Sequence, residues 1–259
     1  GTAICGRWLN LGWDVYGTYR SESEAVHRLR NEGMKLEFCD LSDTGSIHDA
    51  CLTLAEKCGQ WDVLVMCPGT QDPVGAFAEG NFDEWEESLM VNFTSQVRII
   101  HELLPSRRVS LPIGPCVLLF AGGGTNNAPV NYSAYTISKI ALIKMCEILD
   151  AEVPHTRFVI VGPGWVNTKI HESTLVAGAR AGANYQRTKD KLNGNELTPM
   201  DKVLDCCDWL IDSPRDLVGG RNFSVVFDRW GEVELSRKLS EDSNMYKLRR
   251  SGNDWTGGS

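Results

Sequence analysis

Two side chains four residues apart, Tyr135 and Lys139, make the strongest chemical pattern in the sequence. They fall in a predicted helix, where residues four apart lie on one face, so the phenol and the ammonium can point into one site. A nearby cation favours the phenolate and lowers the tyrosine pKa from its reference value of about 10. Tyr135 is then usable as a general acid in carbonyl reduction or as a base in alcohol oxidation. The spacing alone is weak, since surface pairs share it, but the position after a strand and Gly122-Gly123-Gly124 strengthens the interpretation.

A polar amide, Asn92, lies in an otherwise apolar helical stretch, Val91-Asn92-Phe93. A buried amide needs hydrogen-bond partners, so Asn92 can hold a local backbone distortion or an ordered water. A capping or solvent-facing asparagine explains the residue equally well.

Charged residues follow two predicted strands near the start of the chain. Arg20 stands where dinucleotide-binding folds place the adenine ribose, and an arginine there suits a 2′-phosphate, whereas an acidic residue suits a 2′-hydroxyl. The alternative is a solvated arginine at a strand end. Asp40 follows the next strand and can accept a hydrogen bond from the adenine amino group or cap a helix, a role that Asp43 also offers.

Proline and glycine follow two later strands, as Pro68-Gly69 and as Pro163-Gly164. Such bends let the backbone pass close to a flat ligand, and the second would meet a nicotinamide amide, with Thr168 as a polar contact. Plain turns explain both pairs equally well.

The elements that must position these residues alternate along the chain. Short apolar runs predict strands, and the longer amphipathic runs between them predict helices. The strands are hydrophobic throughout, which indicates a sheet covered on both faces. We therefore predict one α/β domain of the Rossmann type, with a doubly wound, mostly parallel sheet and ligands beyond the carboxyl ends of its strands. The predicted strands are residues 14–19, 35–39, 62–67, 116–121, 158–161 and 223–227, and the predicted helices are 22–31, 46–58, 82–104, 132–152 and 200–211.

A polar stretch, residues 171–195, lies between the predicted strand 158–161 and the predicted helix 200–211. We expect it to form a mobile lid over the substrate or a surface helix. His171 is the histidine near this lid.

Composition excludes several classes of protein. The 259 residues carry a net charge of −8, which argues against nucleic acid or an anionic membrane as the main partner. No apolar run approaches the roughly 20 residues of a membrane span. Nine cysteines without a Cys-x-x-Cys pair or a zinc-like cluster predict buried thiols in a reducing, cytoplasmic setting, and no metal site.

In this order and spacing, the motifs resemble the short-chain dehydrogenase/reductase (SDR) family over residues 1–227. The resemblance implies that Tyr135 is the catalytic acid/base, that Lys139 holds the nicotinamide ribose and lowers the Tyr135 pKa, and that Asn92 supports a proton-relay water. Arg20 resembles the NADP-preferring branch, with NAD as the alternative cofactor. The residues that the resemblance assigns to cofactor binding are Gly1, Tyr19, Arg20, Asp40, Leu41, Cys67, Gly69, Tyr135, Lys139, Pro163, Gly164, Val166 and Thr168.

Two motifs depart from the family pattern. The family carries Asn-Asn-Ala-Gly where this chain has Met66-Cys67-Pro68-Gly69, which weakens the cofactor hydrogen bonds or moves them to the backbone. The family's substrate-orienting serine falls on Ala121 or Gly122, and the nearest hydroxyl is that of Thr125. The role of that serine would then fall to Thr125, to a backbone N–H or to a bound water.

The two ends of the chain also differ from the family. Gly1 matches the last glycine of the phosphate-binding fingerprint, because Gly12 and Arg20 follow at the family's offsets. We therefore expect the first strand, which the family places in the middle of the sheet between residues 14–19 and 62–67, to be missing from this sequence. Residues 228–259 are expected to form an extension that packs on the domain or on a neighbouring subunit.

The leading hypothesis is an NADP-dependent oxidoreductase that interconverts a small-molecule carbonyl and an alcohol by hydride transfer. A cofactor-binding protein with weak or lost catalysis and a regulatory role is the alternative, motivated by the missing serine. A nucleotide-sugar epimerase or dehydratase ranks last, because those usually add a larger C-terminal domain. The resemblance also implies a homodimer or homotetramer, formed through the helices at 82–104 and 132–152.

Overall fold

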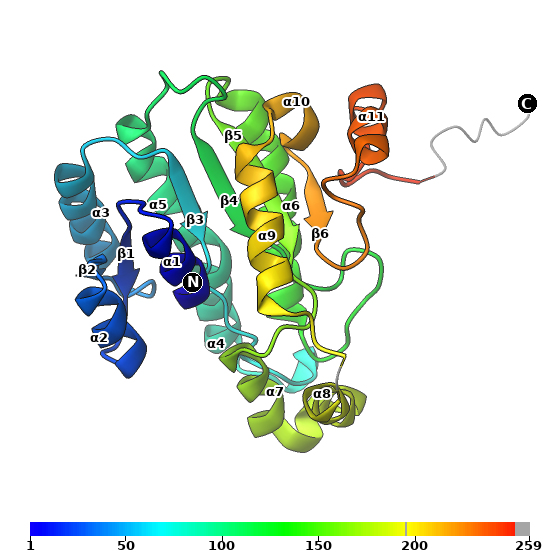
Figure 1. The fold of residues 1–259 in the computed structure, drawn as a ribbon. Helices are drawn as coiled ribbons and strands as arrows, with labels where there is room; N and C mark the ends of the chain where they lie inside the picture. The colour runs from blue at the N-terminus through cyan, green and yellow to red at the C-terminus, as the bar shows by residue number, and fades with distance from the viewer. Residues whose placement is uncertain (195, 252–259) are drawn as a thin grey trace, which may run out of the picture.

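The computed structural model describes residues 1–194 and 196–251, and its centre is a parallel sheet with helices on both faces (Figure 1). The larger sheet has the order β3-β4-β5-β6, and a second sheet pairs β1 with β2. All of these pairs are parallel. The strands are β1 (Tyr16–Tyr19), β2 (Lys35–Phe38), β3 (Val63–Met66), β4 (Cys116–Phe120), β5 (Arg157–Gly162) and β6 (Asn222–Ser224).

Helices fill the connections between the strands, and one further helix precedes the first strand and one follows the last. They are α1 (Thr2–Asn10), α2 (Glu24–Asn31), α3 (Thr44–Cys58), α4 (Phe82–Leu89), α5 (Ser95–Leu103), α6 (Ser133–Glu152), α7 (Glu172–Ala177), α8 (Ala183–Asn193), α9 (Met200–Asp212), α10 (Arg215–Val218) and α11 (Val233–Glu241).

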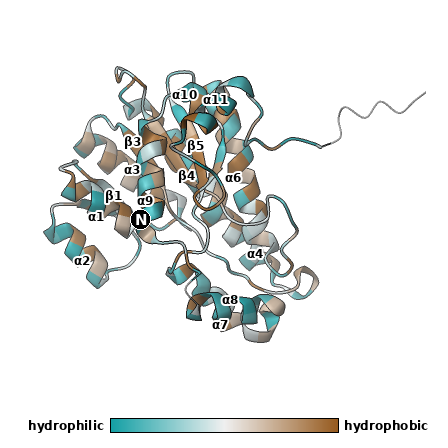
Figure 2. Ribbon diagram, turned by 45° about the vertical axis from the view of Figure 1, so that its right-hand side comes forward, coloured by the Kyte–Doolittle hydropathy of each residue, from teal (hydrophilic) through white to brown (hydrophobic). Residues whose placement is uncertain are grey.

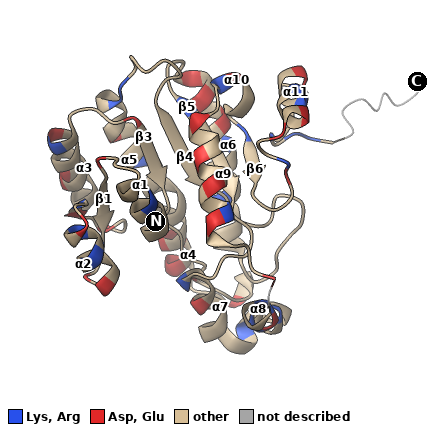
Figure 3. Cartoon of the chain, viewed as in Figure 1, with Lys and Arg blue, Asp and Glu red and all other residues tan. Residues whose placement is uncertain are grey.

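Two cores lie on opposite faces of the larger sheet. In β4, Cys116 and Leu118 join the core formed with α1 and α9, whereas Val117 and Leu119 join the core formed with α3, α5 and α6. Successive side chains of a strand point to opposite faces, so a strand between two helix layers is apolar at every position. Figure 2 shows β4 and β5 as hydrophobic, and Figure 3 shows the charged residues on helices and loops around them. The predicted α/β fold is confirmed.

The structure differs from the prediction in how the sheet is divided. The predicted single sheet is two sheets in the described residues, because β1 and β3 do not pair with one another. The missing middle strand between them stays a prediction. On one face, Ile4 and Trp8 of α1 pack in the same core as Val15, and Val63 and Val65 of β3 pack against that core.

Two further boundaries differ for local reasons. The predicted strand 223–227 ends at Ser224, because the Ser224 N–H donates to the Asp228 carboxylate at 2.6 Å and folds the chain into a turn. The predicted helix 82–104 is divided into α4 and α5 by a π turn, Met90–Thr94. Helix α1 was not predicted at all.

The predicted lid and extension both contain helices. Residues 171–194 form α7, a 3₁₀ turn (Gly178–Ala181) and α8, beyond the carboxyl ends of the strands (Figure 1). In the extension, Leu235 and Leu239 of α11 are buried in the same core as α9. Asn195 of the predicted lid and residues 252–259 of the predicted extension lie outside the described residues. None of the described helices has both the length and the hydrophobicity that crossing a membrane requires.

Candidate active site

Tyr135 and Lys139 lie in the first two turns of α6, beside the carboxyl end of β4. Lys139 is buried, and its Nζ donates to the backbone oxygens of Phe120 at 3.2 Å and of Pro68 at 3.3 Å. The same Nζ lies 6.0 Å from the centroid of the Tyr135 ring. Lys139 therefore ties the end of β4 to the loop after β3, with the phenol beside it.

Gly122 makes room for the Tyr135 side chain. A Cβ at Gly122 would lie 2.6 Å from Tyr135 Oη and 2.9 Å from Lys139 Cγ. Real Cβ atoms do not approach that closely, so no side chain fits at Gly122 with Tyr135 in this position. Gly122 is one of the two positions, with Ala121, on which the family's serine would fall, and Tyr135 fills the space that a side chain at Gly122 would need.

Burial shifts the pKa values of Tyr135 and Lys139 in the directions that favour their uncharged forms. It raises the pKa of Tyr135 to about 12. It lowers the pKa of Lys139 to about 8, against a smaller opposite effect of the Cys67 thiol. The shift of Tyr135 is opposite to the expected lowering, because desolvation dominates and the Lys139 ammonium is bonded to carbonyl oxygens. Tyr135 is accordingly a proton donor at neutral pH.

Asn92 lies in the π turn, which confirms a local backbone distortion at this residue. Its Oδ1 accepts from the Thr70 N–H at 2.8 Å, and its Nδ2 donates to the Thr70 carbonyl at 2.9 Å and to Ser88 Oγ at 3.2 Å. Both backbone groups of Thr70 are therefore held by one amide. The Asn92 side chain fixes the loop after β3.

Gln96 is a site residue that the sequence analysis missed. It is fully buried, and its Nε2 donates to the Asn92 carbonyl at 2.7 Å and to the Pro68 carbonyl at 3.2 Å. The available signal was its spacing, because a second polar amide one helical turn after Asn92 lies on the same helix face.

A cavity of about 510 Å³ runs along the carboxyl ends of β1, β2 and β3. It brings together Tyr19, Arg20, Leu41 and Gly69 of the predicted cofactor site. The other lining residues are Thr18, Cys39, Pro68, Thr70, Asp72, Pro73, Glu84, Glu87, Ser88 and Val91. Gly69 also adjoins the reactive pair, since a Cβ there would lie 3.5 Å from Lys139 Nζ.

Asp40 does not line this cavity. Its Oδ1 accepts from the Ser42 N–H at 2.9 Å and from the Ser42 hydroxyl at 2.8 Å, and these bonds lower the pKa of the Asp40 carboxyl. Asp43 caps α3 by accepting from the Gly45 N–H. The Asp40 carboxylate thus has a local structural role, and its contact with adenine stays a prediction.

The residues after β5 lie in a second region of the site. Gly164 has a φ of +77°, and a Cβ there would lie 2.5 Å from Thr198 Oγ1, so glycine is required at this bend. The Val166 carbonyl bonds to His171 Nε2 at 3.0 Å. Thr168 and His171 line a second cavity of about 330 Å³, which residues of α7 and α8 also line. Pro163 adjoins Gly164 in the same turn.

Gly1 lies beside the end of β3. A Cβ on Gly1 would contact the Cys67 Cβ at 3.7 Å, and the Gly1 carbonyl accepts the first hydrogen bond of α1, from the Cys5 N–H at 3.0 Å. Gly1 and Cys67 are therefore neighbours at the N-terminus of α1, and their contact with a cofactor stays a prediction. Within residues 1–194 and 196–251, no cluster of three His, Cys, Asp or Glu side chains could hold a metal ion.

Comparison with known proteins identifies the family. Residues 1–225 match the family model described as enoyl-(acyl carrier protein) reductase. The chain belongs to the short-chain dehydrogenase/reductase family. An SDR relative, the human protein named dehydrogenase/reductase SDR family member 2, mitochondrial, is 25% identical over 87% of this chain and 81% of its own length. An uncharacterized oxidoreductase of Schizosaccharomyces pombe is 28% identical over 47% of this chain, and the match spans about half of that protein (48%).

Solved structures of SDR enzymes share the fold. The KRED1-Pglu enzyme superposes with a TM-score of 0.75 at 21% identity, covering 85% of this chain and 94% of that one. A variant of actinorhodin polyketide ketoreductase, solved with NADPH, superposes with a TM-score of 0.74 at 21% identity, covering 86% of this chain and 90% of its own. At this level of identity the likeness concerns the fold.

Proposed function

We propose that this SDR oxidoreductase reduces a small-molecule carbonyl to an alcohol with NADPH, with Tyr135 as the general acid. One observation carries the proposal. Tyr135 and Lys139 meet at the carboxyl end of β4, and Lys139 Nζ lies against Gly69 at the edge of the large cavity that reaches Arg20. The Tyr135 phenol, the Lys139 ammonium and the cavity of about 510 Å³ thus adjoin one another.

The residues present suit NADP. Arg20 is exposed and lines the cavity, where its charge also lowers the pKa of the Asp40 carboxyl. Its guanidinium suits a 2′-phosphate. The N-terminus of α1 at Gly1 offers backbone N–H groups to the pyrophosphate. Lys139 can donate to the hydroxyls of the nicotinamide ribose. The NADPH of the ketoreductase structure supports the same cofactor here, with NAD as the alternative.

The proposed mechanism transfers one hydride from the cofactor and one proton from the protein to the carbonyl group. When bound, NADPH supplies the hydride that adds to the carbonyl carbon. Tyr135 Oη donates its proton to the carbonyl oxygen, which completes the alcohol and leaves a phenolate. Lys139 stabilises that phenolate by its positive charge, and Asn92 holds the loop of Thr70 and Gly69 in place through two hydrogen bonds.

Substitution of Tyr135 by Phe tests this proposal. Tyr135→Phe removes only the acidic hydroxyl, so we expect the reduction rate to fall by at least about 100-fold, while NADPH binding, followed by fluorescence titration, stays within about twofold. Arg20→Asp should weaken NADPH binding and favour NADH. An unchanged rate of carbonyl reduction in Tyr135→Phe would contradict the assigned role.

A second candidate function is cofactor binding with weak or lost catalysis. The observation that favours it is the pair Ala121-Gly122, because neither position carries the hydroxyl of the family's serine and no side chain fits at Gly122 beside Tyr135. This candidate expects NADPH binding without turnover across a panel of aldehydes and ketones. Measurable reduction of any carbonyl in that panel would exclude it.

We also infer a cytoplasmic homo-oligomer. All nine cysteines are free thiols, which supports a reducing compartment. Of the apolar residues expected at the interface, Leu142 and Ile143 are buried in the core of the subunit, whereas Ile148 is exposed on α6 and available to a second copy. The oligomeric state in solution is measured by sedimentation.

A further inference from the structure

Gln96 joins two carbonyl groups that belong to different parts of the active site. The Asn92 carbonyl lies in the π turn between α4 and α5, and the Pro68 carbonyl lies in the loop after β3. Gln96 Nε2 donates to both of them, at 2.7 Å and 3.2 Å. The Pro68 carbonyl is also an acceptor for Lys139 Nζ, at 3.3 Å. Gln96 and Lys139 therefore share one acceptor.

The orientation of the Gln96 amide follows from its partners. Both partners are carbonyl oxygens, which only accept hydrogen bonds, so the NH₂ group must face them. The other atom of the amide, Oε1, is buried and has no partner within the described residues. An unpartnered buried acceptor costs about 1–3 kcal/mol. An apolar side chain would avoid that cost, so a donor toward the two carbonyls is the property that distinguishes glutamine here.

We propose that Gln96 is a positioning residue of this site: its amide holds the Pro68 carbonyl where the Lys139 ammonium bonds to it, and it occupies the Asn92 carbonyl with a protein donor. The kinetic part of this inference rests on the proposed reductase function, whereas its binding part rests only on the proposed binding of NADPH beside Lys139. Without the amide, the Pro68 carbonyl is free to turn away, and the Lys139 ammonium loses one of its two oxygen partners.

The loss of a carbonyl partner has a defined electrostatic direction. Hydrogen bonds to the ammonium favour the charged form of Lys139, so their loss lowers its pKa further below its present value of about 8. The titratable groups that face Lys139 are Tyr135 of α6 and Cys67 at the end of β3. Gln96, Asn92 and the surrounding carbonyls are uncharged. A shift of the Lys139 titration therefore reports on its oxygen partners.

The test follows NADPH binding and carbonyl reduction between pH 7 and 10. Gln96→Met keeps the length of the side chain without its donor, and we expect the pH at which NADPH affinity falls by half to move down by about half a unit or more. We expect kcat to fall about 5- to 10-fold with a smaller change in the KM for the carbonyl. Gln96→Asn, which keeps the amide but is one methylene shorter, should shift the midpoint in the same direction and serves if the Met variant does not fold.

Thr156→Val is the matched control. Thr156 is equally buried and its hydroxyl has no partner among the described residues, but it precedes β5 at the opposite end of the sheet. We expect this variant to keep the wild-type pH midpoint. A Gln96 variant that keeps the wild-type midpoint, whatever its stability, would overturn the inference. A wild-type protein that binds NADPH without turnover would instead refute the proposed reductase, and the binding midpoint would still decide the role of Gln96.

Discussion

At the scale of single residues, Tyr135 and Lys139 occupy the space that a side chain at Gly122 would need. A Cβ at Gly122 would lie only 2.6 Å from Tyr135 Oη and 2.9 Å from Lys139 Cγ. The tyrosine hydroxyl is the far end of a side chain and can move aside, so we expect a substitution here to change the position of the Tyr135 hydroxyl more than the stability of the fold.

Gly122→Ser, which places a serine at one of the two positions where the family's serine would fall, is therefore expected to impair carbonyl reduction. We expect the rate of carbonyl reduction to fall by at least about tenfold, because the new Cβ displaces the Tyr135 hydroxyl from its place beside Lys139. The control is Gly123→Ser, since a Cβ at Gly123 has no atom within 4 Å, and it should keep the wild-type rate. Turnover by Gly122→Ser at or above the wild-type rate would show that the tyrosine does not need this space.

At the scale of elements, the lid is tied to the loop after β3 by side-chain hydrogen bonds. Ser173 Oγ of α7 donates to the Asp72 carboxylate at 2.7 Å, and Thr174 Oγ1 donates to Gln71 Oε1 at 3.0 Å. The Thr174 hydroxyl also bonds to Tyr132 Oη at 2.8 Å. Since Asn92 holds Thr70 in the same loop, the position of the lid is coupled to the π turn.

Removal of the Thr174 hydroxyl is predicted to loosen the lid. Thr174→Val keeps the volume of the side chain but leaves the buried Tyr132 hydroxyl and the half-buried Gln71 amide oxygen without this partner, which costs about 1–3 kcal/mol locally. We expect faster hydrogen exchange of the α7 amides and a KM for the carbonyl raised about three- to tenfold. Thr53→Val on α3, whose hydroxyl bonds only to the Asp49 carbonyl, is the control. Unchanged exchange in α7 of the Thr174 variant would mean that apolar packing alone holds the lid.

An element could be predicted from the sequence where neighbouring residues determine it, and could not where contacts between distant residues do. The strands were predictable because β4 and β5 are buried on both faces and consist almost wholly of apolar residues. The π turn was predictable only as a possible distortion at Asn92, because its partner Thr70 lies in a distant loop. The role of Gln96 depends on the Pro68 carbonyl, and the filled space above Gly122 depends on the side chain of Tyr135. Such contacts across the fold leave no periodic pattern in the sequence.

At the scale of the whole molecule, Arg221 ties the C-terminal extension to the sheet. It is buried just before β6, and its guanidinium donates to three carbonyls, those of Leu239 at 2.7 Å, Asp242 at 3.0 Å and Met245 at 2.6 Å. These carbonyls lie at and beyond the end of α11, where a helix presents unpaired carbonyl groups and favours a cation. Burial lowers the pKa of Arg221, against smaller opposite effects of the Asp242 and Asp216 charges, and the three carbonyl oxygens accept the hydrogen bonds of the guanidinium.

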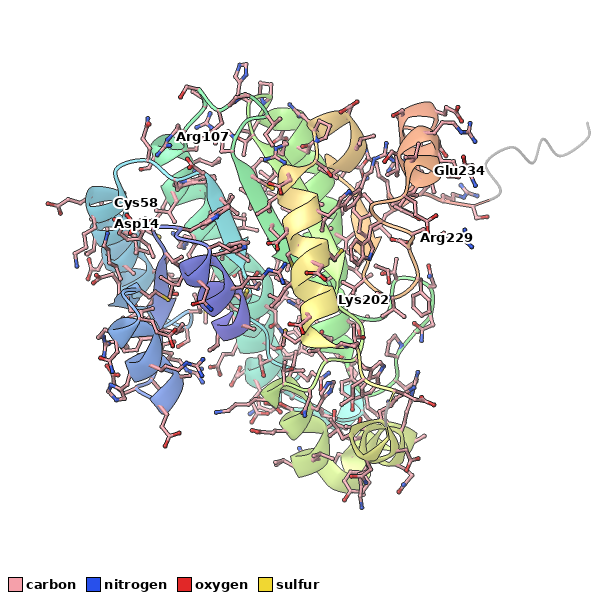
Figure 4. All side chains as sticks on the ribbon, in the orientation of Figure 1. Asp14, Cys58, Arg107, Lys202, Arg229 and Glu234 are labelled. Carbon is pink, nitrogen blue, oxygen red and sulfur yellow. The ribbon has the colours of Figure 1, made fainter. Side chains whose placement is uncertain are left out.

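Arg221→Met should therefore detach the extension before the rest of the fold unfolds. The substitution leaves three carbonyls without a charged donor, at a cost of about 3 kcal/mol after the desolvation cost of the buried cation is removed. We expect limited proteolysis to cleave within residues 228–251 at protease concentrations that leave the wild-type protein intact. Arg229→Met is the control, because the Arg229 side chain is 81% exposed and projects from the loop near α11 (Figure 4), and it should change the free energy of unfolding by less than about 0.5 kcal/mol. Equal protease resistance of Arg221→Met and the wild type would show that burial of Leu235 and Leu239 is enough to hold the extension in place.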